Sequence, residues 1–590
     1  MKNEKIPIIV GVTGHRNIVG EDKAEIKAKV VDSLKEIQNL CKGKDGNDTP
    51  VIMLNAFAQG ADMLCAEAAF ELGIDVYAVL PRDEKKYIDS FDDEADRAKL
   101  FEYLSKAKRK FVAPDMEKNK AWLKKTIYID DDSYEYRQLG IYMAEHSHIL
   151  IALWDGKPPK TQFGCGTVEV IKFALEHNFL DKDHLFKPGA INNSAVVWIK
   201  SRRQGDGDSA DIQKQWLISS LDSCGKDSSE YLTSTEPPEF LKDIISKTAR
   251  YNADTVSVGD DAVNLWANVD ELDEYRKNVR YHYAKANELS YGKNQKKYNL
   301  FLLLIAIIGT VIAFTFLIYD DAGLPYMIFP CTLALGAILW LCYYGRKKKY
   351  HADYIEYRAL AEALRIQFYT SMCLGEKEIV TDVCDLYSWS QKMDLVWIDK
   401  AIRALSVINS TDKLSVTPSA VMEVWIGKSE KPMGQLRYHS GKLGVNKKQA
   451  KKYESFSKVF RCATVAIYFI IFAFEVAACI MKAAGVDWFY VNDIFGNISW
   501  RSFCAIVLGV FTAGSLLFSS YWGRLSFDRK LDDNIKMCEY YASAYARWNE
   551  VKAHPNGEIE KFVREIAREE IVENGVWYSY VKENGLDITI

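Results

Sequence analysis

Two hydrophobic patterns divide this chain. In the first third, short apolar runs alternate with amphipathic stretches, and the runs lie at 7–13, 51–57, 76–80, 110–113, 148–154 and 195–199. Buried strands separated by helices are typical of a parallel, doubly wound sheet. The sequence therefore predicts a Rossmann-like α/β domain at the N-terminus.

The second half carries four much longer apolar runs. They are Leu300–Tyr319, Tyr326–Tyr344, Cys462–Met481 and Ser502–Trp522, and Glu475 is the one charged residue among them. A helix of about 20 residues crosses a hydrocarbon core of about 30 Å. The pattern predicts an α-helical membrane region with four transmembrane helices in two hairpins.

Basic residues gather on one side of these runs. They are Lys293, Lys296 and Lys297 before the first run, Arg346–Lys349 after the second, six bases from Lys447 to Arg461 before the third, and Arg524, Arg529 and Lys530 after the fourth. The link Asp320–Pro325 has two acids and no base. Because positive charge favours the cytoplasmic side, we expect a multi-pass protein with both termini in the cytoplasm.

The two hairpins share an order of helix, two spans and helix. Arg280-Tyr281-His282 and Arg437-Tyr438-His439 precede the first and third spans at similar distances, which predicts an internal repeat. Glu475 either lines a pore or bonds a neighbouring helix, or it is a protonated acid near Lys482 at the span end. Gly509 and Ala513 have the small-residue spacing that permits close helix packing.

Composition narrows the function. The chain has 76 basic and 80 acidic residues, a net charge of -4, which argues against nucleic acid as the main partner. Its 12 cysteines form no C-x-x-C pair, so no metal site is indicated.

The first strand of the predicted sheet ends in a glycine-rich loop, Gly11-Val12-Thr13-Gly14-His15-Arg16. Gly11 and Gly14 would let backbone N–H groups approach a phosphate closely. In the same loop, Thr13 can donate a hydrogen bond and Arg16 can pair with the anion.

Two further loops have related chemistry. Gln59, Gly60 and Asp62 open a helix, where Asp62 either caps the helix or binds ribose hydroxyls. Trp154 and Asp155 end the strand 148–154, and Trp154 could stack on a base. The next helix opens with Gly164, Gly166, Thr167 and Glu169, a pattern that favours phosphate and sugar hydroxyls.

All three loops belong at the carboxyl ends of the strands, where parallel sheets bind ligands. We therefore expect a nucleotide-derived ligand there and no other cofactor. Neither G-x-x-x-x-G-K-[ST] nor G-x-G-x-x-G occurs, so the sequence does not predict a Walker or dinucleotide site.

The segments GVTGHR, QGAD and IALWDG…FGCGTVE resemble the SLOG superfamily, which includes LOG-type phosphoribohydrolases and DprA-like proteins. The hairpins and the ending EEIVENGVWYSY resemble SLATT-type membrane effector regions. The resemblance implies a sensor of a nucleotide second messenger, such as a cyclic oligonucleotide or an ADP-ribose derivative, in a bacterial anti-phage system. It also implies a messenger-producing enzyme as a partner and a location in the bacterial inner membrane.

Three departures separate this chain from the LOG-type enzymes. The proline of their P-G-G-x-G-T segment is missing, an insertion runs from Lys157 to Phe163, and Arg137 matches their helix arginine without the following lysine. These departures argue against N-glycosidic hydrolysis and leave phosphate and ribose binding, to which Arg137 would contribute. A membrane-anchored nucleotide hydrolase remains the alternative, and a non-conducting receptor is a third possibility.

These observations predict six segments. They are 1–205, a SLOG-like nucleotide-binding domain; 206–298, a linker and a long helix; 299–345, the first hairpin; 346–461, a cytoplasmic helical segment; 462–522, the second hairpin; and 523–590, a C-terminal helical segment. We expect a homo-oligomer in the lipid bilayer, because four spans from one chain are too few to enclose a pore.

Overall fold

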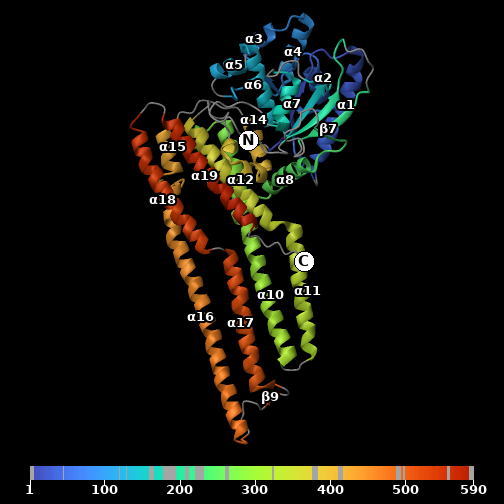
Figure 1. Ribbon diagram of the computed structural model, residues 1–590. Helices are drawn as coiled ribbons and strands as arrows, with labels where there is room; N and C mark the ends of the chain where they lie inside the picture. The colour runs from blue at the N-terminus through green and yellow to red at the C-terminus, as the bar shows by residue number, and fades with distance from the viewer. Residues whose placement is uncertain are drawn as a thin grey trace.

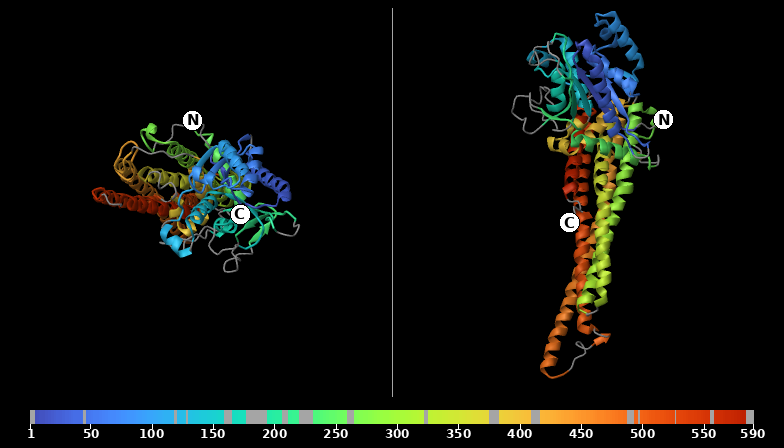
Figure 2. Two further views of the ribbon diagram at one scale, coloured as in Figure 1. Left: turned by 90° about the horizontal axis from the view of Figure 1, so that it is seen from above. Right: turned by 90° about the vertical axis from the view of Figure 1, so that its right-hand side faces the viewer.

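The computed structural model describes residues 5–43, 46–117, 120–127, 129–158, 165–176, 194–205, 211–219, 231–258, 265–321, 325–374, 383–408, 416–486, 493–495, 498–525, 527–554 and 558–583. An α/β domain lies at one end, packed helices form the middle, and two helical hairpins extend away from it (Figures 1 and 2).

The α/β domain is built on an eight-stranded sheet with the order β4-β3-β2-β1-β5-β6-β7-β8. The strands are β1 (Ile8–Gly14), β2 (Val51–Asn55), β3 (Asp75–Leu80), β4 (Arg109–Val112), β5 (Ile149–Trp154), β6 (Ala195–Lys200), β7 (Lys214–Ile218) and β8 (Leu232–Ser234). The first six are the predicted strands and pair in parallel, whereas β7 and β8 are antiparallel additions. The predicted Rossmann-like sheet is therefore confirmed.

Helices cover both faces of the sheet because alternate strand residues point to opposite sides. Ile8 and Val10 of β1 share a core with α1 (Lys23–Leu40) and α2 (Ala61–Glu71), whereas Ile9 shares a core with α6 (Asp131–His146). The other helices of this domain are α3 (Glu84–Asp89), α4 (Glu94–Lys106), α5 (Lys120–Ile127), α7 (Thr167–Glu176) and the short η1 (Gly20–Asp22).

The strand order reverses between β1 and β5. From β1 the chain moves outward through β2, β3 and β4, and then crosses to β5 on the other side of β1, where Gly14 lies opposite Leu153. Such a reversal leaves a crevice at the carboxyl ends of the two strands. This is where two of the predicted loops begin.

The rest of the chain is mostly helical. Its elements are α8 (Glu239–Thr255), η4 (Val269–Glu271), α9 (Glu274–Asn287), the π-helical η5 (Glu288–Asn294), α10 (Gln295–Asp321), η6 (Pro325–Met327), α11 (Ile328–Lys348), α12 (Tyr350–Leu374), η8 (Val383–Leu386), α13 (Trp389–Asp394), α14 (Val396–Ile408), α15 (Pro418–Trp425), α16 (Gln435–Ala483), β9 (Asp493–Phe495), β10 (Ile498–Ser499), α17 (Trp500–Leu525), α18 (Phe527–Val551) and α19 (Glu558–Glu583). One hydrophobic core joins α9, α12, α14 and α19 to the sheet residues Ile9 and Leu54.

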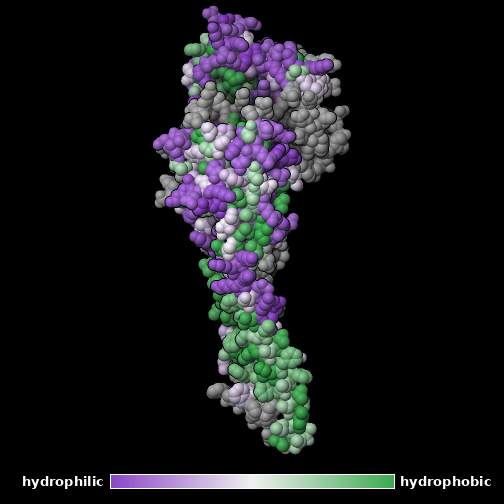
Figure 3. Space-filling model, turned by 90° about the vertical axis from the view of Figure 1, so that its left-hand side faces the viewer, coloured by the Kyte–Doolittle hydropathy of each residue, from purple (hydrophilic) through white to green (hydrophobic). Residues whose placement is uncertain are grey.

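Three continuous helices are long and apolar enough to cross a membrane. They are Glu274–Asp320, Ile328–Leu374 and Gln435–Ala483, and among the described side chains Trp500–Leu516 is a shorter apolar helix. Hydrophobic residues cover the far end of the molecule (Figure 3). By length and composition, the described residues thus contain three candidate membrane spans, while the fourth span within α17 stays a prediction.

Each hairpin adjoins a pair of packed helices on the side of the α/β domain. Helix α12 packs along α9, and α18 packs along α16, so that each hairpin is flanked by a pair of packed helices. The hairpins also touch each other through α10 and α17. This arrangement agrees with the predicted order of helix, two spans and helix.

Candidate functional site

His15 brings the three predicted loops together. Its carbonyl accepts a hydrogen bond from the Ala61 N–H at 3.1 Å, and its Nε2 accepts one from the Asp155 N–H at 3.2 Å. Thr167 Oγ1, at the start of α7, lies 3.4 Å from His15 Nδ1. The loop after β1, the start of α2, the loop after β5 and the start of α7 therefore meet at His15, whose side chain is buried.

Three of the predicted glycines lie against the protein itself. A Cβ atom would come within 2.3 Å of Ser147 Oγ at Gly11, within 2.3 Å of the Ala61 Cβ at Gly14, and within 2.2 Å of the Arg16 carbonyl oxygen at Gly60. These glycines let chain segments pack closely, and Gly60 also has a φ of 78° that favours glycine. At Gly11 and Gly14, the absence of a side chain serves this close packing rather than the predicted approach of a phosphate.

Gly166 differs from these three glycines. It is exposed at the start of α7, and the nearest atom to a Cβ there would be Glu169 Oε2 at 3.2 Å. The backbone at this helix N-terminus is therefore open to a ligand. Gly164, the remaining predicted loop glycine, lies outside the described residues.

Arg16 stands at the rim of the crevice. Its guanidinium lies over the ring of Tyr136, 5.2 Å from the centroid, and Arg82 approaches the same ring at 5.4 Å. Arg82 also pairs with Asp132 at 3.1 Å and Glu135 at 2.9 Å. Because Arg16 is exposed, its charge is available to an anion arriving from solvent.

Asp62 and Gln59 bond to nearby protein groups at the start of α2. Asp62 Oδ2 accepts a hydrogen bond from the Ala58 N–H at 3.3 Å, and burial raises the pKa of this carboxyl to about 7. Gln59 Nε2 donates to Asp96 Oδ2 at 2.8 Å. The Asp62 carboxyl thus changes its charge near neutral pH, close enough to Arg16 to be influenced by it.

The loop after β5 is held by its own contacts. The Asp155 carboxylate pairs with Arg203 at 3.0 Å and also lies 3.2 Å from His15 Nε2. Trp154 donates from Nε1 to the Lys157 carbonyl at 3.0 Å, and its ring lies 5.4 Å from that of Trp198. Trp154 therefore already has an indole partner, and Asp155 fixes the loop rather than facing solvent.

The start of α7 adds three polar groups. Thr167 and Glu169 are buried, and burial raises the pKa of Glu169. Cys165, just before the helix, is half-buried close to Ser133, Glu169 and Arg16. A neutral Glu169 would donate a hydrogen bond to a hydroxyl or phosphate oxygen that its ionised form could not.

Arg137 lies in a buried pair on the inner side of α6. Its Nε and one terminal nitrogen each lie 2.8 Å from the carboxylate oxygens of Glu117, and its guanidinium lies 4.8 Å from the Phe173 ring centroid. The two-pronged bond to Glu117 satisfies much of its donor capacity. Its predicted role as a ligand residue is therefore not one that its contacts favour.

Three residues at the crevice were not predicted from the sequence: Arg82, Tyr87 and Tyr136. The Tyr87 hydroxyl is buried near Asp62, Arg16 and Tyr136, and within the described part of the chain it has no hydrogen-bond partner. An unpaired buried hydroxyl costs stability, so a ligand oxygen is a plausible partner for it. Of the three, only Arg82 had a sequence signal, because it follows a predicted strand end.

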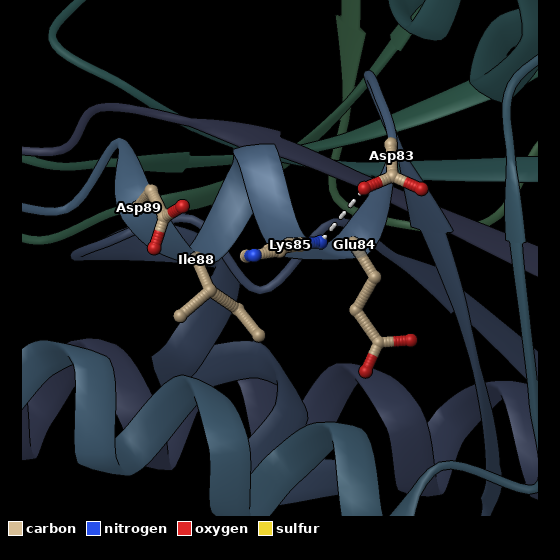
Figure 4. A pocket seen from close by; sticks show the side chains of 5 residues that line it. All are labelled: Asp83, Glu84, Lys85, Ile88 and Asp89. Carbon is tan, nitrogen blue, oxygen red and sulfur yellow. Dashed lines mark hydrogen bonds between the residues drawn. The ribbon is translucent and has the colours of Figure 1, made fainter.

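A shallow pocket lies elsewhere, on the outside of α3. Asp83, Glu84, Lys85, Ile88 and Asp89 line it (Figure 4), and the Asp83 carboxylate accepts a hydrogen bond from the Lys85 N–H at 3.1 Å. Three acids against one base do not suit an anionic ligand. None of these residues belongs to the predicted site.

The predicted membrane residues lie at helix contacts. Glu475 Oε1 pairs with Arg501 Nε at 2.7 Å, which joins α16 to α17 and differs from the expected neighbour Lys482. A Cβ at Gly509 would come within 2.4 Å of Leu317 Cδ1, so Gly509 allows α17 to pack closely on α10. Ala513 lies one turn further along α17 and is half-buried.

No protein-family model matches this chain, and no curated protein is detectably similar to it. The site must therefore be judged by its chemistry. It offers an exposed guanidinium, an open helix N-terminus, an unpaired hydroxyl and two carboxyls with raised pKa values. This set is suited to binding a phosphorylated ligand, and it contains no activated nucleophile among the described residues.

Proposed function

We propose that this protein is a ligand-gated membrane effector whose α/β domain binds a nucleotide second messenger. The observation that carries the proposal is the meeting of three phosphate-type loops at His15, at the switch between β1 and β5. Ligands of doubly wound sheets bind at such a switch. Arg16 and the backbone at Gly166 would hold phosphate, and the Tyr87 hydroxyl would gain its missing hydrogen bond.

Helix α6 offers a physical route from this site toward the membrane helices. Its first turns carry Tyr136 beside Arg16, and its last residues are contacted by α14. Lys400 of α14 donates to the carbonyls of Glu145 at 3.1 Å and Ser147 at 2.7 Å. A cation at a helix C-terminus is favourable, so Lys400 fastens α14 to the end of α6.

Helix α14 in turn contacts α9 and α12, which continue into α10 and α11. Helix α8 adds a second link, because Asn252 bonds both backbone groups of Ile6 just before β1, at 3.0 and 2.9 Å. At the same helix, Tyr251 donates to the carbonyl of His282 in α9 at 3.0 Å. A ligand shifts such an equilibrium only by its differential affinity for two arrangements of these helices.

We further propose that the chain crosses the bacterial inner membrane four times, with both termini in the cytoplasm. Several copies would form a homo-oligomer that opens a pore in the membrane or disrupts it. The exposed apolar surfaces of α10, α11, α16 and α17 support contacts with lipid and with further copies of the chain. The anti-phage context and the messenger-producing enzyme are supported by the SLOG and SLATT resemblance.

Calorimetry with cyclic dinucleotides and ADP-ribose, paired with dye release from proteoliposomes, tests the proposal. Arg16→Ala should weaken binding at least about tenfold, since a charge-assisted phosphate contact is lost. Tyr87→Phe should weaken binding while leaving the unliganded protein as stable or more stable, because an unpaired buried hydroxyl is removed.

The matched control is Arg97→Ala on exposed α4, which removes the same charge and should bind normally. Binding without dye release would favour a non-conducting receptor. Normal binding by both site variants would show that the ligand site lies elsewhere.

One observation favours the alternative hydrolase. Glu169 combines burial, a raised pKa and a place at the start of α7 beside the crevice, which are properties of catalytic acids. If the protein is a hydrolase, it should release base from nucleoside monophosphates, and Glu169→Gln should abolish that release. Activity that survives in Glu169→Gln would rule out this role for the residue.

A further inference from the structure

We infer that a basic band on α16, residues Lys442–Arg461, is a docking surface for anionic phospholipid headgroups. The band holds seven basic residues and one acid. All seven bases are exposed, and the exposed apolar residues Val445, Phe456 and Val459 lie among them. Cations interleaved with apolar side chains next to a membrane helix suit the interface of an anionic leaflet.

Most basic residues of the band form no ion pair with the described residues of the protein. Glu454 pairs with Lys458 at 2.7 Å, one helical turn away. Within the described ranges, no carboxylate lies within ion-pair distance of the amines of Lys447, Lys448, Lys451 or Lys452. These four lysines therefore form a patch of uncompensated positive charge.

The position of the band relative to the two hairpins determines which part of a bilayer it can contact. The α16/α17 hairpin extends well beyond the α10/α11 hairpin (Figures 1 and 2), and a hydrophilic zone lies directly above its hydrophobic end (Figure 3). Phe460, at the end of the band, lies near Phe511 of α17 with ring centroids 6.0 Å apart. Two residues away, Gly509 packs on Leu317, near the far end of the first apolar run.

The band therefore runs beside α10 rather than above it. If the bilayer were centred on α10, the band would lie in the hydrocarbon core, where charged side chains have a high free-energy cost. Headgroup phosphates at the edge of the bilayer offer the alternative, because long lysine side chains can reach them from an apolar helix. The depth of the second hairpin would then depend on the charge of the leaflet as well as on the length of its apolar run.

Amine labelling of the full-length protein tests this inference. The protein is placed in nanodiscs of phosphatidylcholine, with or without phosphatidylglycerol, and acetylation of each lysine is followed by mass spectrometry. We expect Lys447, Lys448, Lys451 and Lys452 to react several-fold more slowly when phosphatidylglycerol is present, and this difference should shrink at high salt. The internal control is formed by four lysines in and just after α1, namely Lys23, Lys29, Lys35 and Lys42, whose rates should not change.

A variant with all four band lysines replaced by Gln should retain fewer phosphatidylglycerol molecules after purification than a variant with the four control lysines replaced by Gln. Equal protection in both lipids, or none in either, would overturn the inference. Equal protection by DNA or polyglutamate added to phosphatidylcholine discs would also overturn it, because the band would then bind any polyanion.

Discussion

The helices that flank the two hairpins differ sharply in how they are held. Before the first hairpin, seven of the 14 residues of α9 are buried, and after it 17 of the 25 residues of α12 are buried, whereas α16, which includes the predicted third span, has one buried residue, Leu436. Helix α12 is surrounded by α9, α15 and α19 and shares its core with the sheet, but α16 packs mainly along α17 and α18. A related sequence pattern has thus been placed in two very different environments.

From this difference in packing we expect the two hairpins to play different parts in the response to a ligand. The first hairpin is an extension of the central core, so a change in the α/β domain reaches it through packed helices. The second hairpin touches that core at few points, and loosely packed elements move at low free-energy cost. We expect the first hairpin to receive the signal and the second hairpin to carry out the larger movement.

The largest expected effect is a loss of unfolding free energy when one arginine is removed from each of the two environments. Arg365 of α12 is buried between Glu362 at 2.9 Å and Glu570 at 3.3 Å, and Glu570 also accepts from Tyr541 and Trp425. Arg365→Ala removes the cation beside the buried Glu570 carboxylate and should cost about 3–5 kcal/mol of unfolding free energy. Denaturant unfolding in detergent measures it.

The matched variant in the second hairpin is Arg437→Ala. Arg437 pairs with Glu430 at 2.7 Å on the surface, so its removal should cost less than about 1 kcal/mol. Similar losses in both variants would contradict the contrast between a buried and an exposed environment.

A smaller effect is expected at the connection between the α/β domain and the first hairpin. The Lys400 amine is buried, donates to Glu145, Ser147 and Ser194, and burial lowers its pKa to about 8. Lys400→Met leaves these acceptors unpaired and should cost about 1–3 kcal/mol. It should also reduce ligand-triggered dye release while ligand binding persists.

The control for this connection is Lys582→Met. Lys582 makes an exposed pair with Asp394 at 2.9 Å, so its loss should change neither property much. Unchanged dye release in Lys400→Met would remove α14 from the proposed route.

The same contrast explains what the sequence could predict. The six parallel strands and the long apolar helices follow from local hydrophobic patterns, since five of the strands are mostly buried and the helices carry long uncharged runs, although β4 alternates half-buried and exposed residues. Strands β7 and β8 lie among polar, Ser-, Asp- and Gly-rich segments and pair only through tertiary contact. They were not predicted because their local pattern is weak.

The sequence predicted which loops form the site, but not which side chains these loops contact. The three loops meet as expected, but Arg137 binds Glu117, and Tyr87, Tyr136 and Arg82 come from elements whose sequences carry no ligand motif. From the sequence alone, Lys400 is an ordinary polar position of an amphipathic helix. Its role depends on its contact with the end of α6, which is more than 250 residues away along the chain.

A third prediction concerns the contact between the hairpins themselves. Gly509→Leu inserts a side chain where Leu317 Cδ1 lies 2.4 Å from a Cβ, and overpacking of this kind costs about 1–3 kcal/mol. Spin labels on α10 and α17 should report an increased separation. Gly514→Leu on the same helix meets open space and serves as the control; equal shifts in both variants would argue against a specific contact at Gly509.

The smallest expected effect is a pH dependence that belongs to the α/β domain alone. Burial raises the pKa of Asp62 to about 7, so as pH rises through this value the carboxyl ionises, native stability falls and negative charge appears near Arg16. An anionic ligand should therefore bind more tightly at pH 6 than at pH 8, by about fivefold if binding raises this pKa by about one unit. Calorimetry with a cyclic dinucleotide measures this effect cleanly, since its phosphodiesters keep their charge over this range.

The Asp62→Asn side chain cannot ionise, so this variant should bind the ligand with an affinity that does not change with pH. The control is Asp96→Asn, which replaces the hydrogen-bond partner of Gln59 and should keep the pH dependence of the wild type. A wild-type affinity that is constant from pH 6 to 8 would mean that the ligand does not sense the charge of Asp62.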